Sequence, residues 1–119
     1  MIVRLNSSAR SLIPGRRHGI RIDFTVSFLD ADHRGMPSHA EQNELAAFED
    51  YMETHVAGHA VLVAVITTSG MREFVLHTDS SDWIDGFHRD LAAALPTHKV
   101  QMLTQLDLDW TVYKSLDPG

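Results

Sequence analysis

The chain has 119 residues, no cysteine and a formal net charge of −6 at pH 7. A chain of this length folds as one domain with its own apolar core. The lack of cysteine excludes disulfide bonds and thiolate chemistry and favours a cytoplasmic location. Residues 1–21 contain five arginines and no acidic residue, so residues 22–119 carry the whole acidic excess. That acidic body should repel phosphate backbones, and no apolar run approaches the roughly 20 residues that span a bilayer, so neither nucleic acid nor a membrane is expected as a partner.

Residues 1–18 are interpreted as an arginine-rich N-terminal leader, and residues 19–119 as a single domain. The leader begins with MIVRL, whose Ile2, Val3 and Leu5 can form a short edge strand. A flexible or self-docked terminus is the ordinary interpretation of such a segment. An arm for an anionic partner and a transit peptide are the alternatives.

Apolar residues alternate with polar ones from Ile20 to Phe28, which predicts a half-buried strand. Ser38 and Glu41 then have the spacing of a capping box, which predicts the start of a helix that runs to about Val56. The buried stripe of this helix consists of Leu45, Phe48, Met52 and Val56.

A β-hairpin is predicted over residues 60–78, where an aliphatic run and an alternating strand flank a Ser-Gly turn. In the second of these strands, Phe74 and Leu76 should face the core. The register stays open, because the first strand is apolar on both faces. A two-residue turn would place Val65 opposite Phe74, and a three-residue turn would place Ala64 there.

Asp79-Ser80-Ser81 is interpreted as the cap of a second helix that runs to about Leu95, and the alternation of Val100–Leu106 predicts a last strand. Phe87 lies on the apolar stripe of this helix and should meet Phe24, Phe48 and Phe74 in one core. The element order predicts an α+β fold, a ferredoxin-like βαββαβ sandwich whose four-stranded antiparallel sheet has two helices on one face. In that fold the strand around residues 61–67 lies at a sheet edge and needs a cover. The leader is the favoured cover, and a homodimer through the open sheet face is the alternative.

Two short motifs extend this interpretation. One is a Gly-x-Arg-Glu-Phe strand, formed by Gly70, Arg72, Glu73 and Phe74. The other is an Asp-x-x-Trp-x-x-Tyr tail, formed by Asp107, Trp110 and Tyr113. With them, residues 19–116 resemble the bacterial domain-of-unknown-function family numbered 695, in which proline occupies the position of Leu108. The resemblance implies a fold like that of a protein regulator of ribonuclease E, which acts by binding, and it provides no catalytic residues to transfer.

The candidate binding face is the side of the sheet away from the two helices. Its residues come from the strands and the tail, and they are Arg21, Asp23, Glu73, His77, Trp110 and Tyr113. Trp110 and Tyr113 either fold over an edge of this face or close the core. No catalytic residue, cofactor or metal is expected, since the best-spaced histidine pair, His55 and His59, is interrupted by Gly58 at a helix end.

These observations favour a non-catalytic protein-interaction or regulatory domain, bacterial and cytoplasmic, with a protein partner. The alternative is a small-molecule-binding protein or an enzyme of the dimeric α+β-barrel type. In that type two open sheet faces pack together, and His77, Glu73 and Asp23 would act as acid–base groups. A cavity between sheet and helix, or between two sheets, would favour the alternative, whereas a flat, hydrated face would favour an interaction domain.

Overall fold

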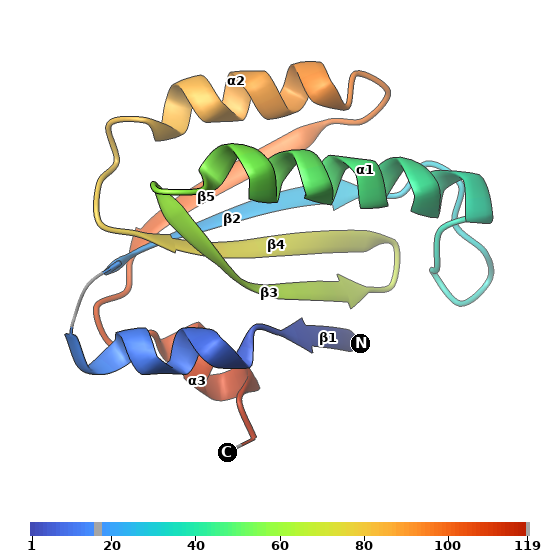
Figure 1. Cartoon of the computed structure of the whole chain (residues 1–119). Coiled ribbons are helices and arrows are strands. Elements are labelled where there is room, and N and C mark those ends of the chain that lie inside the picture. Colours follow the sequence, from blue (N-terminus) through green and yellow to red (C-terminus); the bar gives the residue numbers. More distant parts are fainter. Residues whose placement is uncertain (16–17, 119) are drawn as a thin grey trace.

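The computed structural model describes residues 1–15 and 18–118. Its elements follow one another along the chain as β1 (Ile2–Leu5), η1 (Ser7–Gly15), β2 (Ile20–Ser27), α1 (His39–Val56), β3 (Ala60–Thr68), β4 (Met71–Thr78), α2 (Ile84–Ala94), β5 (Val100–Leu106) and α3 (Thr111–Leu116). The strands form one antiparallel sheet in the order β1-β3-β4-β2-β5 (Figure 1). The predicted α+β class is confirmed, but the predicted four-stranded sheet is wrong, because β1 adds a fifth strand beyond β3.

The leader covers the edge of the central hairpin. β1 pairs with β3 over its whole length, from Ile2 opposite Thr67 to Leu5 opposite Ala64. This pairing satisfies backbone groups of β3 that an exposed edge would leave unpaired. The expectation that MIVRL covers this strand is therefore confirmed.

The hairpin uses the shorter of the two predicted turns. Val65 lies opposite Phe74, and Thr68 lies opposite Met71, so only Ser69 and Gly70 form the loop. Gly70 has a φ of +86°, a left-handed conformation that glycine adopts without a steric penalty. The register shifts by one residue further along β3, between Leu62 and Ala64, which is the signature of a β-bulge.

The first apolar core lies between the sheet and the pair of helices α1 and α2 (Figure 1). Phe24, Phe48, Phe74 and Phe87 all belong to it, as their positions on apolar stripes predict. The Phe48 and Phe74 rings meet edge to face at 5.5 Å, and the Phe24 and Phe87 rings do so at 6.0 Å. Such contacts add to the stabilisation that comes from burying the rings.

Helix α1 begins after Ser38 as predicted, whereas α2 begins later than predicted. Ser38 caps α1 by accepting a hydrogen bond from the Glu41 amide at 3.2 Å. The Glu41 carboxylate does not return to Ser38, so the capping box is only half formed; it accepts from the amides of Leu29 and Asp30 and from His98 instead. Helix α2 begins only at Ile84, and no side chain caps it.

A second, smaller core lies on the opposite face of the sheet, beneath η1 and α3 (Figure 1). Trp110 and Tyr113 are its largest side chains, and both are fully buried. The Tyr113 hydroxyl donates a hydrogen bond to the Asn6 carbonyl at 2.8 Å, which joins the tail to the N-terminal segment. The aromatic pair therefore closes a core, but this core lies on the sheet face away from α1 and α2, which is the face over which the pair could also fold.

Candidate functional site

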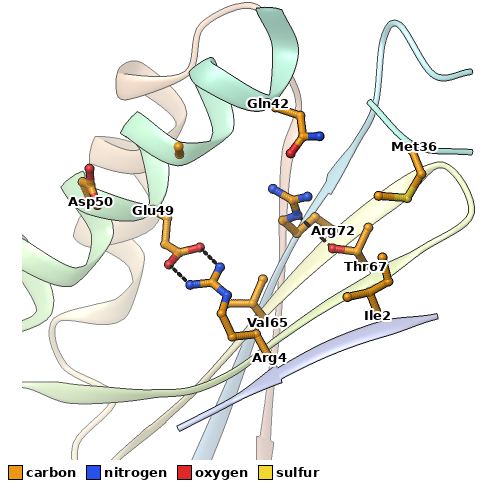
Figure 2. A pocket seen from close by; sticks show the side chains of 10 residues that line it. Ile2, Arg4, Met36, Gln42, Glu49, Asp50, Val65, Thr67 and Arg72 are labelled. Atoms are coloured by element: carbon orange, nitrogen blue, oxygen red, sulfur yellow. Dashed lines mark hydrogen bonds and ion pairs between the residues drawn. The ribbon is translucent and has the colours of Figure 1, made fainter. Parts of the chain in front are cut away.

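A cavity of about 520 Å³ opens between α1 and strands β1, β3 and β4 (Figure 2). Its lining combines polar and apolar side chains, namely Ile2, Arg4, Met36, Gln42, Ala46, Glu49, Asp50, Val65, Thr67 and Arg72. We call it the α1–sheet cavity. It needs β1 to exist, because Ile2 and Arg4 form one of its walls.

Arg72 projects into the α1–sheet cavity from β4 (Figure 2). Strand alternation directs it to the same side of the sheet as Phe74, and its side chain is half-buried. Its Nε donates to the Thr67 hydroxyl at 3.0 Å, and its guanidinium carbon lies 5.7 Å from the centre of the Phe28 ring. These contacts hold the guanidinium in one orientation.

The two terminal nitrogens of Arg72 have no hydrogen-bond partner within residues 1–15 and 18–118, and no carboxylate there lies within ion-pair distance. Burial lowers the pKa of Arg72 from its ordinary value, while the charge of the Glu49 carboxylate acts in the opposite direction. The guanidinium stays protonated, because arginine does not lose its proton in proteins. The cavity thus contains a positive charge with unused donors.

A second arginine in the cavity is already neutralised. Arg4 forms two parallel hydrogen bonds with the Glu49 carboxylate, at 2.7 and 2.5 Å (Figure 2). The Glu49 side chain is 12% exposed and the Arg4 side chain 63%, so the pair joins α1 to β1 at the mouth of the cavity. The hydrogen bonds that Arg4 donates to the Glu49 carboxylate raise the pKa of Arg4. Arg4 is thus paired with a carboxylate, whereas the terminal nitrogens of Arg72 are unpaired within the described residues, so Arg72 is the arginine that can bind an anion in this cavity.

The predicted binding face holds a buried polar cluster, which we define as Arg21, Asp23, His77 and Asp107. Arg21 donates to Asp23 at 3.1 Å, to Asp107 at 3.3 Å and to Gln105 at 2.8 Å. Burial raises the pKa of Asp23, against the lowering effect of Arg21. Asp107 differs, because hydrogen bonds from the first amides of α3 together with Arg21 outweigh its burial and lower its pKa.

His77 lies in the same cluster, fully buried and stacked on Trp110 with ring centres 4.0 Å apart. Its Nδ1 donates to the His18 carbonyl at 2.6 Å, and its Nε2 lies 4.0 Å from an Asp107 oxygen. Burial lowers the pKa of His77 more than its partners raise it, which favours the neutral imidazole at pH 7. The imidazole is therefore closed to solvent, with Trp110 covering one face of the ring.

The structure therefore brings some of the predicted site residues together and separates others. Arg21, Asp23, His77 and Trp110 surround Asp107. Glu73 lies half-buried on β4, where burial and the charge of Asp23 raise its pKa. Tyr113 turns toward the N-terminal segment.

The α1–sheet cavity was not among the sites predicted from the sequence. One signal for it was present, because the alternation of β4 assigns the charged Arg72 to the same side as Phe74 and Leu76. A cation at a core-facing position needs a partner or a polar space.

Comparison with known proteins identifies a family but no function. The family model described as "Family of unknown function (DUF695)" matches residues 1–116. Neither the curated proteins nor the solved structures include a match to the chain. Within residues 1–15 and 18–118, no helix has the length and apolarity to cross a membrane, and no three His, Asp or Glu side chains are grouped to hold a metal ion.

Proposed function

Since the chain belongs to DUF695, a family of unknown function, we propose from its own geometry that it is a non-catalytic binding domain for a small anionic molecule. The ligand would occupy the α1–sheet cavity, with its carboxylate or phosphate group on Arg72. A cavity of about 520 Å³ lies within the range of roughly 300–1,000 Å³ that is typical of small-molecule sites.

The orientation of Arg72 is the observation that carries this proposal. Its Nε is used by Thr67, so the two terminal nitrogens remain for a ligand. These nitrogens form a planar fork that matches two oxygens of a carboxylate or phosphate. Because the group is already half-buried, an anion there would gain charge-assisted hydrogen bonds in a site of reduced dielectric constant.

A cavity between helix and sheet was the feature expected to favour a small-molecule-binding protein, whereas a flat sheet face was expected to favour a protein-interaction domain. Binding of a protein partner is the second candidate function. We also propose that the protein is bacterial and cytoplasmic. The barrel-type enzyme has less support. Its acid–base group His77 lies beneath Trp110, and η1 and α3 occupy part of the sheet face that two copies would have to share.

We also propose that β2 to β5 with α1 and α2 form a ferredoxin-like unit that β1 extends. The support for this is the strand order β3-β4-β2-β5, antiparallel throughout, with both helices on one face. That order agrees with the split βαβ arrangement.

The proposed function can be tested by titrating the ¹⁵N-labelled chain with succinate and with inorganic phosphate and following amide chemical shifts. We expect saturable shifts confined to the cavity, at Gln42, Thr67 and Arg72. Arg72→Gln should abolish them, and Arg89→Gln, which removes an exposed arginine of α2, should leave them unchanged. Shifts that survive in Arg72→Gln, or the absence of saturation with both anions, would contradict the proposal.

A further inference from the structure

Strand β5 is an edge of the sheet with an open row of backbone groups. The amide of Asp107 donates to the Gly19 carbonyl directly opposite. Since the pairs that exchange hydrogen bonds alternate along an antiparallel ladder, the odd-numbered residues of β5 bond to β2. The N–H and C=O groups of Met102, Thr104 and Leu106 therefore point away from the sheet. The N–H and C=O groups of Val100 also point away from the sheet, and its carbonyl accepts a hydrogen bond from the His88 ring of α2.

This edge lacks the usual protection against pairing with another chain. Proteins block such edges with proline, charge or short strand length. The seven residues of β5 contain neither proline nor charge. Two of its leucines are well exposed, Leu103 at 56% and Leu106 at 70%. The other edge of the sheet, β1, is four residues long and carries Arg4.

We propose that two copies of this chain pair through β5 in antiparallel orientation, so that their two sheets become continuous. The inference does not depend on the anion site. Charge selects the antiparallel orientation, because β5 is preceded by the exposed Lys99 and followed by two aspartates, of which Asp109 is exposed. An antiparallel pair places the basic end of one strand beside the acidic end of the other, whereas a parallel pair would place like charges together.

The outward backbone groups and the exposed leucine together select one register. Hydrogen-bonded pairs between the copies must use outward residues on both sides, which allows Met102 to face Thr104 of the partner subunit. A two-fold axis then passes through Leu103, which meets its own counterpart in a non-hydrogen-bonded pair, where side chains lie closest. This register removes the exposed Leu103 side chain from water in both copies.

The first test is sedimentation equilibrium on the full chain and on Thr104→Pro. Because the Thr104 amide points outward, proline removes no bond to β2, and prolines are tolerated at such edge positions. It removes one hydrogen bond from each copy of the dimer, which should raise the dissociation constant about tenfold or more. Thr104→Val keeps the amide and serves as the control. A wild-type chain that stays monomeric at all concentrations would overturn the proposal.

The second test uses the absence of cysteine from the chain. Leu103→Cys should form an intermolecular disulfide on oxidation, since the two side chains meet at the axis. Gln101→Cys should not, because Gln101 faces Gln105 of the partner subunit in this register. Circular dichroism would verify that each variant is folded. Equal cross-linking at both positions, or none at Leu103→Cys, would overturn the proposed register.

Discussion

The face of the sheet beneath α1 and α2 is packed mainly by apolar side chains, whereas the face beneath η1 and α3 buries charges beside a smaller apolar cluster. On the first face the phenylalanine rings fill space between helices and strands. On the second face Arg21 joins two carboxylates next to the His77–Trp110 stack. The first face should therefore respond to changes of volume, and the second to changes of charge and pH.

The largest effect should come from a cavity in the first core. Phe74→Ala removes a fully buried ring at the centre of that core, which should lower the free energy of unfolding by about 3–5 kcal/mol. Urea unfolding followed by circular dichroism measures this loss. Phe28→Ala, at a partly buried position beside the core, should cost clearly less. A loss below about 1 kcal/mol, which is ordinary for a surface position, would mean that Phe74 does not lie in this core.

The sequence predicted the first face well because its signals are local. Strand alternation and helix stripes need only neighbouring residues, and they identified Phe24, Phe48, Phe74 and Phe87 as partners. The start of α2 was predicted too early, because the Asp79-Ser80-Ser81 segment satisfies a sequence rule for caps, whereas the helix begins at Ile84 and no side chain caps it.

The second face and the cavity depend on contacts between distant parts of the chain, and a sequence does not encode these by spacing. Tyr113 meets Asn6 across 107 positions, and Arg4 meets Glu49 across 45. Arg21, Asp23 and His77 lie on the same side of the sheet, as strand alternation predicts. Asp107 was not among the predicted site residues, and the stacking of His77 on Trp110 was not predicted. The alternation of β4 assigns Arg72 to the core side, where a cation needs a polar space, but the other walls of that space come from α1 and β1.

A smaller loss than that of Phe74→Ala is expected when the buried polar cluster loses its cation. Arg21→Gln leaves Asp23 and Asp107 buried without their positive partner, which should cost about 1–3 kcal/mol. Arg89→Gln removes an exposed arginine and should stay within about 0.5 kcal/mol of the wild type. Equal effects of the two changes in urea unfolding would mean that the cluster contributes nothing specific to stability.

The two faces of the sheet should also differ in how their contributions to the free energy of unfolding depend on pH. The folded state lowers the pKa of His77 below its unfolded value of about 6.5, mainly through burial. Between the two pKa values the unfolded chain binds more protons, so the free energy of unfolding falls as the pH drops below about 6.5 and is fully retained above it. Unfolding at pH 7.5 and pH 5.5 should show a smaller difference in His77→Gln than in the wild type.

A histidine outside the cluster provides the control for this pH effect. The His39 side chain is exposed, so His39→Gln should keep the wild-type difference between the two pH values. An unchanged difference in His77→Gln would contradict the argument that burial of the imidazole makes the second face sensitive to pH.

The smallest effect concerns the one hydrogen bond by which Tyr113 ties the second face to the N-terminal segment. Tyr113→Phe keeps the buried ring and removes only the hydroxyl that donates to the Asn6 carbonyl. That carbonyl also accepts from the Ala9 amide, so it does not become unpaired, and the loss should be about 0.5–1.5 kcal/mol. Because the Asn6 amide donates to the Val63 carbonyl of β3, amide exchange at Asn6 should accelerate in Tyr113→Phe while amides of β2 keep their protection. Equal acceleration in β2 would show that the two faces open as one unit, and that the N-terminal segment is not held separately by the tail.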